Sequence, residues 1–286
     1  MSSIPPETQR KEAELEGRLR AAGSVLVAFS GGVDSSYLAL AAHRALGARA
    51  LAVTAVSPSY PASHRRVAED VVARFGLAHR FVDTSEMENA DYRANRPDRC
   101  YHCKSELFDV LGRLRERLGF DAVAYGVNTD DRGDFRPGHR AAAERAVLSP
   151  FLDVGLSKAE IRALSRAAGL PTADLPASAC LASRLPYGTE VTRERLSQVE
   201  EGEERLRALG FRQLRVRHHG TLARVEIDPA ELPRALDPAM AARIAAALKP
   251  LGFRFVALDL EGYRTGALNE VLGPEGRARA SGSPRP

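Results

Sequence analysis

The chain has 286 residues, of which 41 are Lys or Arg and 37 are Asp or Glu, so its formal net charge is +4. This length exceeds the usual ~100–200 residues of a single domain and predicts two domains. The mild positive charge, with both signs mixed along the sequence, argues against the concentrated basic field of a dedicated nucleic-acid binder. An anionic small molecule fits the charge equally well.

The three cysteines, Cys100, Cys103 and Cys180, are an odd number that cannot pair completely within the chain. Such sparse cysteines are typical of a reducing compartment, where they tend to be reactive or metal-bound. The first residues contain no apolar segment of a signal peptide, and no stretch approaches the ~18 apolar residues of a membrane span. We therefore expect a soluble, cytoplasmic protein.

Short apolar runs alternate with helical patterns up to about residue 185. This alternation predicts an α/β fold in which a parallel sheet is covered by helices on both faces. Sheets of this kind bind ligands beyond the carboxyl ends of their strands. The predicted elements are, in chain order, a strand at 24–29, a helix at 35–46, a strand at 50–56, a helix at 64–75, a strand at 78–83, a helix at 105–118 and a strand at 121–127.

Residues 170–189 change character, because prolines and a glycine interrupt every helical or strand pattern, and this predicts a long loop that carries Cys180. A smaller α+β domain is predicted to follow. Its elements are a helix capped by Thr192 and running to Leu209, segments 213–218 and 222–227, a helix around 239–248, and segment 253–259. We therefore predict domains at residues 1–185 and 186–272, and a disordered tail at 273–286.

The most informative motif, SGGVDSS, follows the first predicted strand. Its two glycines permit close approach of the backbone to a ligand, and the helix behind it offers free N–H groups and the positive end of its dipole. The serine hydroxyls add donors, so an anion cradle is predicted. The chain contains neither the Gly-Lys pair of a Walker loop nor a Gly-x-Gly fingerprint. The candidate ATP-binding residues here are Ser30, Gly31, Gly32, Val33, Asp34, Ser35 and Ser36.

A second candidate segment, GVNTDD at residues 126–131, follows the fourth predicted strand. Mg²⁺ favours one or two carboxylates together with phosphate oxygens. Asn128 and Asp130 are therefore predicted to contact ATP and its Mg²⁺. Ordinary Asx-turn chemistry is the competing interpretation, and the position at the ligand edge of the sheet favours the functional one.

The cysteines form two separate motifs. Cys100 and Cys103 make a C-x-x-C pair, which alone leaves open a redox pair, half of a zinc site or two unrelated thiols. Cys180 lies in the predicted loop with Arg184 four residues later, and a nearby guanidinium favours the reactive thiolate. An inert loop cysteine is the competing interpretation of Cys180.

Segment LRVRHH at residues 214–219 alternates, so Arg215 and Arg217 are expected on one face of a strand and Leu214 and Val216 on its core face. Paired guanidinium groups suit bidentate binding of phosphate or carboxylate. Arginines on exposed strands are often only solvated, which is the competing interpretation.

Six segments, taken in order, resemble the LarE family of ATP-dependent sulfur transferases, which belongs to the PP-loop ATP pyrophosphatases. They are SGGVDSS, DRCYHCK, GVNTDD, PASACLASRLPYGT, LRVRHHG and GYRTGALN. The resemblance spans about residues 24–269. It implies an adenylating PP-loop domain that uses ATP and Mg²⁺ and releases AMP and pyrophosphate. The implied substrate is pyridinium-3,5-biscarboxylic acid mononucleotide, which receives sulfur on the route to the nickel-pincer nucleotide cofactor of lactate racemase.

The resemblance also implies roles for individual residues. Glu203 is the hardest to place, because a run of four glutamates on one predicted helix offers several registers. Most of these glutamates are expected to face solvent. The implied catalytic residues are Asp34, Cys180, Ser183 and Arg184, and the implied substrate-binding residues are Glu203, Arg215, Arg217 and Arg264.

Members of the family differ in the source of the sulfur. In one type the cysteine that matches Cys180 gives up its own sulfur and becomes dehydroalanine. In the other, three cysteines bind a [4Fe-4S] cluster whose open iron carries an extra sulfide. Because all three cysteines of this chain lie in motifs, Cys100, Cys103 and Cys180 favour the cluster type. Sacrifice of Cys180, or zinc held by the three thiolates and His102, is the competing interpretation.

The expected partners are the mononucleotide substrate, a sulfide donor, other proteins of cofactor maturation and further copies of the chain, with no nucleic acid and no membrane. A tRNA thiolase would use the same adenylation chemistry on a base carbonyl, but the chain has no paired-C-x-x-C zinc ribbon and no long basic stripe with aromatics. A nucleotide-sensing or scaffold protein with an inactive PP-loop is another alternative. An amidotransferase-coupled synthetase is disfavoured because it needs no cysteine triad.

Overall fold

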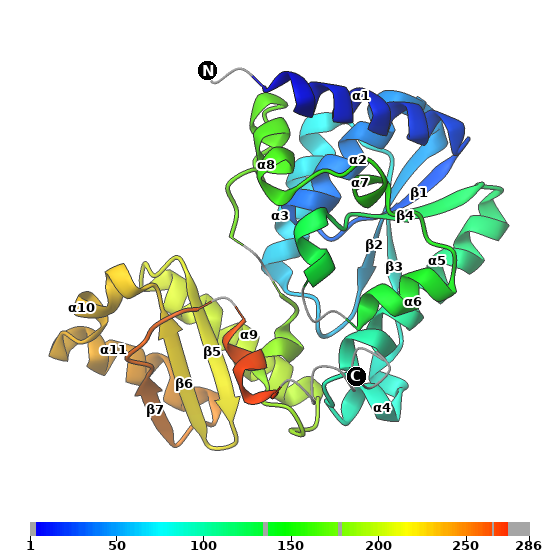
Figure 1. Cartoon of the computed structure of the whole chain (residues 1–286). Coiled ribbons are helices and arrows are strands. Elements are labelled where there is room, and N and C mark those ends of the chain that lie inside the picture. Colours follow the sequence, from blue (N-terminus) through cyan, green and yellow to red (C-terminus); the bar gives the residue numbers. More distant parts are fainter. Residues whose placement is uncertain (1–3, 134–136, 177–178, 265, 274–286) are drawn as a thin grey trace. The chain divides into compact units, whose positions relative to one another are not determined.

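The computed structural model describes residues 4–133, 137–176, 179–264 and 266–273 (Figure 1). The chain divides into two compact units, of which unit 1 comprises residues 1–86 and 100–178 and unit 2 comprises residues 87–99 and 179–286. Unit 2 therefore includes an internal segment at 87–99 that the sequence-based division after residue 185 does not contain. Apart from Gly273, the predicted tail lies outside the described residues.

Unit 1 is built on a parallel sheet whose strand order is β3-β2-β1-β4. Val25 lies opposite both Ala50 and Ala122, so the carboxyl ends of the strands meet at one edge of the sheet. The α/β fold and all four predicted strands are confirmed. The strands are β1 (Val25–Ala28), β2 (Ala50–Val56), β3 (His79–Asp83) and β4 (Ala122–Tyr125).

Helices cover both faces of this sheet (Figure 1). One face packs against helices α1, α2, α3 and α8, and the other packs against α5 and α6. Helix α5 begins at Arg99 rather than at the predicted residue 105, so the C-x-x-C pair lies in its first turns. The helices are α1 (Pro6–Ala21), α2 (Val33–Leu46), α3 (Ala62–Phe75), α5 (Arg99–Leu118), α6 (Gly138–Glu144), α7 (Pro150–Asp153) and α8 (Lys158–Ala167).

Unit 2 contains a three-stranded sheet of order β5-β6-β7, in which β5 and β6 are antiparallel and β6 and β7 are parallel. Leu214, Val216 and Val225 face a core formed with helices α9 and α11. The predicted α+β organisation of this region is therefore found. Its elements are α4 (Ala90–Arg93), the 3-10 helix η4 (Leu181–Arg184), α9 (Arg193–Ala208), β5 (Leu214–His219), β6 (Leu222–Ile227), α10 (Leu232–Ala235), α11 (Pro238–Leu248) and β7 (Phe255–Leu258).

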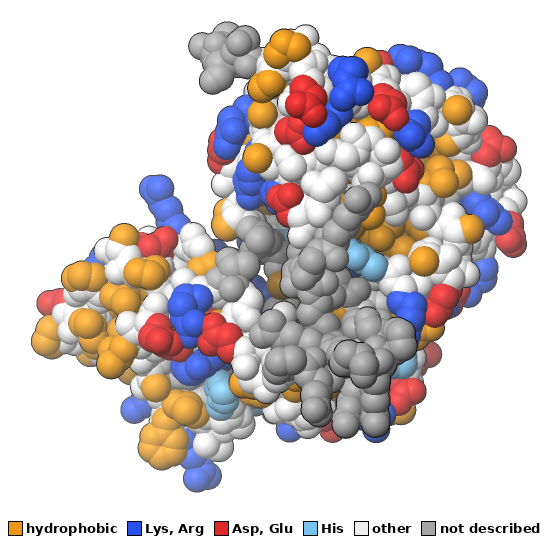
Figure 2. Space-filling view, in the orientation of Figure 1, with side chains coloured by type: hydrophobic (Ala, Val, Ile, Leu, Met, Phe, Trp, Pro, Cys, Tyr) orange, Lys and Arg blue, Asp and Glu red, His pale blue; other side chains and the backbone are white. Residues whose placement is uncertain are grey.

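The surface carries charges of both signs. On the face shown in Figure 2, basic and acidic side chains are interspersed over both units.

Among the helices that the structure describes, none has the length and apolar character needed to cross a membrane.

Candidate functional site

The PP-loop connects the end of β1 to the start of α2 in unit 1. Gly31 has φ of 78°, and a Cβ there would lie 3.1 Å from the carbonyl oxygen of His64. Glycine is therefore required both by the left-handed backbone and by the close approach of α3. Ser35 braces the loop, because its Oγ accepts from Ser30 N at 3.2 Å and donates to Gly32 O at 3.1 Å.

Asp34, in the first turn of α2, is the meeting point of three segments of unit 1. Its carboxylate forms an ion pair with Lys158, the first residue of α8. Asn128 donates to the other carboxylate oxygen at 3.4 Å. The turn after β4 approaches this helix so closely that a Cβ on Gly126 would lie 2.9 Å from the carbonyl carbon of Asp34. The two predicted ATP motifs are thus brought together.

The GVNTDD segment shows the hydrogen bonds of an Asx turn as well as the position expected of a ligand site. Asp130 N donates to Asn128 Oδ1 at 3.0 Å, while the Asp130 carboxylate accepts from Lys158 N at 3.2 Å. Both Asp34 and Asp130 therefore border Lys158. Two carboxylates beside a phosphate loop fit the ligand preference of Mg²⁺.

Lys158 was not among the residues predicted from the sequence. Its position follows from the capping box that starts α8, in which the side chain of Ser157 accepts from Glu160 N and the side chain of Glu160 accepts from Ser157 N. The SKAE pattern is a sequence signal for such a helix start. On this fold the start of α8 lies beside the phosphate loop, which makes Lys158 an additional candidate ATP-binding residue.

The start of α8 is in turn fixed to α1. Lys11 donates to Glu160 Oε1 at 2.8 Å and to Gly155 O at 2.9 Å. Burial alone would raise the pKa of Glu160, but the hydrogen bonds from Lys11 and Ser157 outweigh it and lower the pKa to about 2. Glu160 is therefore ionised throughout the neutral range and holds this junction in place.

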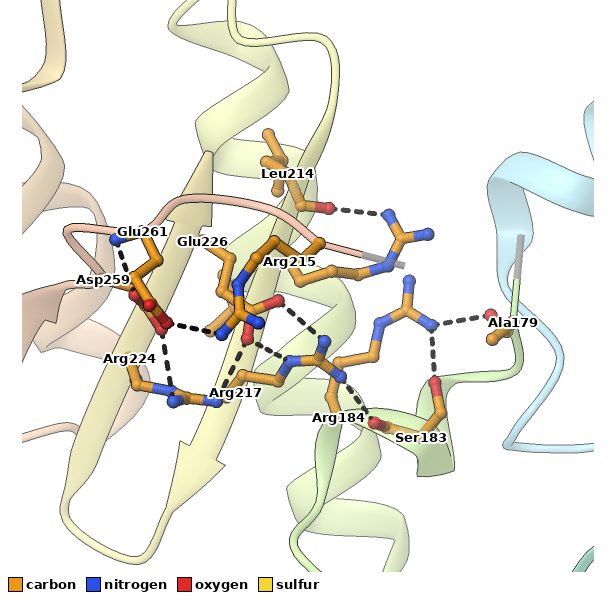
Figure 3. Close-up of polar contacts among 12 residues, drawn as sticks. Ala179, Ser183, Arg184, Leu214, Arg215, Arg217, Arg224, Glu226, Asp259 and Glu261 are labelled. Atoms are coloured by element: carbon orange, nitrogen blue, oxygen red, sulfur yellow. Dashed lines mark hydrogen bonds and ion pairs between the residues drawn. The ribbon is translucent and has the colours of Figure 1, made fainter. Parts of the chain in front are cut away.

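In unit 2, Cys180 directly precedes η4 and is half-buried. Ser183 Oγ donates to the carbonyl oxygen of Cys180 at 2.7 Å, and Arg184 donates to the same oxygen at 2.9 Å. Arg184 also donates to Ala179 O at 2.6 Å (Figure 3). The sequence suggested that the guanidinium acts on the thiolate. In the structure, Arg184 contacts Cys180 through its carbonyl and so fixes the backbone that carries the thiol.

Glu203 of α9 holds Arg184. Its two carboxylate oxygens accept from Arg184 Nε at 2.8 Å and from Arg184 Nη2 at 3.1 Å. Burial alone would raise the pKa of Glu203, but Arg184, Arg215 and Arg207 lower it below its usual range. Within the run of glutamates, Glu203 is the buried member. Its carboxylate is thus engaged by arginines.

Arg215 and Arg217 lie on the face of β5 opposite the core, as predicted, but they are only 9% and 6% exposed, so the interpretation as solvated surface arginines is wrong. Arg217 forms a bidentate pair with Glu226 of β6 at 2.8 and 2.7 Å and donates to Ser183 O at 2.8 Å. This pair depends on strand register, which the sequence does not show.

The surroundings of Arg215 disfavour its positive charge. It donates to Leu214 O at 2.7 Å, and its guanidinium lies 4.9 Å from the centre of the Tyr263 ring. Burial and the charge of Arg184 lower the pKa of Arg215 to about 10. An anionic group bound beside it would favour its charged form, so the arrangement suits a carboxylate or a phosphate.

Arg264 follows Tyr263 and is engaged on both sides by carboxylates, pairing with Glu261 at 2.5 Å and with Glu270. These pairs are partly exposed, since the Arg264 side chain keeps 41% of its surface accessible. Arg264 therefore belongs to a more open group of charges than Arg184 and Arg217.

The three cysteines are divided between the units. Cys100 and Cys103 lie on α5 in unit 1, and Cys180 lies in unit 2. All three are described, and none forms a disulfide. Across the described ranges, no group of three or more His, Cys, Asp or Glu side chains is placed to hold a metal ion. The predicted cluster would therefore take ligands from both units.

Comparison with known proteins agrees with this geometry. The family model described as "Asparagine synthase" matches residues 12–109, which include the PP-loop and β1 to β3. A pyridinium-3,5-bisthiocarboxylic acid mononucleotide synthase of Lactiplantibacillus plantarum is 33% identical over 92% of this chain and 95% of its own length. The chain belongs to the LarE family. It is an ATP-dependent sulfur-transferring enzyme with a PP-loop, as the resemblance implied.

Other relatives extend this LarE assignment. An uncharacterized protein of Synechocystis sp. is 45% identical over 86% of this chain and 92% of its own length. The tRNA-specific 2-thiouridylase MnmA of Rhizorhabdus wittichii is 31% identical, with 67% of this chain and 62% of that protein covered. The LarE-type relative is matched almost end to end, whereas the match to the thiouridylase leaves more than a third of that protein uncovered.

Proposed function

We propose that this chain adenylates a carboxylate of pyridinium-3,5-biscarboxylic acid mononucleotide and replaces one of its oxygens by sulfur. The near end-to-end match to a relative named for the corresponding thiocarboxylate supports this substrate. The observation that carries the proposal is the buried arginine cluster around residues 179–191, which we name the Cys180 loop. In this cluster Arg184, Arg215 and Arg217 outnumber the buried Glu203 and Glu226. Such a cluster suits a substrate with several anionic groups.

In the first step, an oxygen of the substrate carboxylate attacks the α-phosphorus of ATP, and the bond to the oxygen bridging the α and β phosphates breaks. The electron pair leaves with pyrophosphate, and an acyl adenylate remains. In this step the N–H groups at the start of α2 and the ammonium of Lys158 would hold the departing pyrophosphate. Mg²⁺ at Asp34 and Asp130 would neutralise phosphate charge.

In the second step, a sulfur nucleophile attacks the activated acyl carbon, and AMP leaves with the electron pair of the bond that joined it to this carbon. The thiocarboxylate is released when the bond between the sulfur and its donor breaks. If the donor is Cys180, the Cβ–Sγ bond breaks by elimination with loss of the Cα proton, and dehydroalanine remains. Arg184 and Ser183 hold the carbonyl of Cys180 and so fix where this residue can act. Activation and sulfur transfer thus depend on different residues of the chain.

For the sulfur source we propose a sulfide carried by a [4Fe-4S] cluster on Cys100, Cys103 and Cys180, which rests on the number and motif positions of the cysteines. Cys100 and Cys103 of unit 1 and Cys180 of unit 2 would hold this cluster, which would supply the sulfide. Sulfur taken from Cys180 itself is the alternative.

The decisive experiment uses protein purified without oxygen, incubated with ATP and the mononucleotide. Iron and acid-labile sulfide are assayed, pyrophosphate release is measured, and the product is identified by mass spectrometry. Substrate-dependent pyrophosphate release together with thiocarboxylate formation supports the function, and absence of both refutes it. Iron with repeated turnovers supports the cluster, whereas one turnover with conversion of Cys180 to dehydroalanine supports its sacrifice.

Thiolation of tRNA is the second candidate function, because of the partial match to a tRNA-specific 2-thiouridylase. It predicts salt-dependent binding of tRNA and ATP-dependent formation of a thiolated base. Titration of the protein with tRNA at two salt concentrations, followed by nucleoside analysis, separates the two substrates.

A further inference from the structure

Asn95 occupies an unusual position in unit 2. It is fully buried and has φ of 51°, a left-handed conformation that Asn tolerates better than most residues with a side chain. Its side-chain amide donates to three backbone carbonyls of the Cys180 loop (residues 179–191). The acceptors are Leu185 O at 3.3 Å, Pro186 O at 2.8 Å and Thr189 O at 2.9 Å.

The backbone around Asn95 binds the same loop. Gly188 N donates to Asn95 O at 2.9 Å, and Val191 N donates to Arg93 O at 2.8 Å. Asn95 and its neighbours thus contact both sides of the turn that the sequence PYGT forms. The contacts come from residues 87–99, the internal segment of unit 2, which we name the anchor segment.

Arg99 extends this contact toward Cys180. It is 3% exposed, and its Nη1 donates to Ala182 O at 2.8 Å and to Asn95 Oδ1 at 2.5 Å. Arg99 therefore orients the amide of Asn95, which leaves the amide N–H groups directed at the loop carbonyls. Ala182 lies two residues after Cys180 and within η4.

The Cys180 loop depends on such contacts because most of it has no regular secondary structure. Within the loop, Arg184 binds the carbonyls of Ala179 and Cys180, and from β5 Arg217 binds that of Ser183. Side chains therefore bind these loop carbonyls, and that of Cys180 also accepts from Ser183 N at 3.0 Å. The anchor segment supplies the corresponding contacts at Leu185, Pro186 and Thr189.

We propose that Asn95 and Arg99 are positioning residues for sulfur transfer. They set the backbone path of the Cys180 loop, and through that path they orient Cys180, Ser183 and Arg184. The kinetic part of this inference rests on the proposed function, whereas its structural part does not. The candidate ATP-binding residues belong to unit 1, so ATP binding is expected to be insensitive to these two side chains.

The test compares substitutions that distinguish the effect of the lost side chain from the effect of an altered backbone conformation. Asn95→Gly keeps the left-handed backbone accessible but removes the amide, whereas Asn95→Ala also penalises the backbone. Arg99→Met keeps an elongated apolar stem and removes the donors. Asn89→Ala is the matched control, because Asn89 caps α4 in the same anchor segment by accepting from Asp91 N at 2.9 Å.

Asn95→Gly and Arg99→Met are expected to lower the rate constant of thiocarboxylate formation about 10- to 100-fold, because small displacements of a reacting group cost rates of this order. The KM for ATP is expected to stay unchanged, and so is substrate-dependent pyrophosphate release when the mononucleotide is saturating. Hydrogen exchange of the amides of Gly188 and Val191 is expected to accelerate. Asn89→Ala is expected to keep wild-type sulfur transfer and wild-type exchange at these two amides.

A purely structural role would lower the melting temperature but leave the rate constant unchanged below it. Wild-type sulfur transfer and wild-type exchange in Asn95→Gly would overturn the proposal. If Asn95→Gly fails to fold, Arg99→Met decides the question by the same criteria. If the wild-type protein shows no sulfur transfer, the proposed function fails, and exchange in the variants alone then supports or overturns the positioning of the loop.

Discussion

Arg184 and Glu203 form a bidentate ion pair in which each side chain is only 2% exposed. Glu203 also accepts from Arg207 at 2.9 Å. The pair connects η4, which follows Cys180, to the middle of α9. Removal of one partner from a buried pair leaves a charge without compensation, and this costs far more than the net contribution of the pair.

Glu203→Gln is therefore expected to lower the free energy of unfolding by about 3–5 kcal/mol. Urea unfolding, followed by circular dichroism, measures this change. Glu201→Gln is the control, because Glu201 is exposed on the same helix and its substitution is expected to change stability by less than about 0.5 kcal/mol. Equal stability of the two variants would contradict the importance of the buried pair.

Lys158→Met is expected to reduce substrate-dependent pyrophosphate release about 100-fold, because it removes the cation beside Asp34 and the phosphate loop. Lys158→Arg is expected to restore part of the rate, since it keeps the charge. The measurement is a coupled pyrophosphate assay over a range of ATP concentrations. Lys249→Met, at an exposed position of unit 2, serves as the control and is expected to match the wild type.

The ionisation of Glu160 predicts a pH dependence of stability. Its pKa is about 2 in the folded chain and 4.5 for the ordinary side chain, so the stabilisation is complete above pH 4.5 and is lost as the pH falls toward 2. Glu160→Gln is expected to remove up to about 3 kcal/mol at neutral pH and to flatten the dependence in this window. Unfolding measured between pH 2 and 7 tests both points, with the exposed Glu69→Gln as control.

Gly31→Ala is expected to destabilise the protein by about 1–3 kcal/mol, because φ of 78° and the carbonyl of His64 at 3.1 Å both oppose a Cβ. It is also expected to weaken ATP binding, which isothermal titration measures. Gly17→Ala is the matched control. Gly17 lies within α1, and a Cβ added there would meet no atom within 4 Å, so the same change is expected to stabilise the helix by about 1 kcal/mol.

The four strands of unit 1 could be predicted because each is a short apolar run, and their parallel order followed from the helices between them. Helix α1 was not predicted, because its sequence is mostly charged and only a few residues, such as Leu15 and Leu19, are buried. The sequence also placed Arg215 and Arg217 on one face of β5. Their burial was not predictable, because Glu226 becomes their neighbour only through the register of β5 and β6.

The site residues that the sequence did not indicate share a physical reason. Lys158 lies 124 positions after Asp34, and Asn95 lies 90 to 94 positions before the loop carbonyls that it binds. Such contacts depend on the tertiary structure, which brings distant parts of the chain together. A local motif contains no information about these long-range contacts, whereas SGGVDSS acts through neighbouring residues and could be recognised directly.

The inclusion of residues 87–99 in unit 2 has a consequence for dissecting the protein. A fragment that starts at residue 179 would contain Cys180 and the whole three-stranded sheet, yet it would lack Asn95 and Arg99. The Cys180 loop of that fragment would have to find other donors for its carbonyls or expose them to water. A separate peptide of residues 87–99 would then restore the missing donors when it binds. Ordering of the Cys180 loop would therefore measure the binding of the peptide.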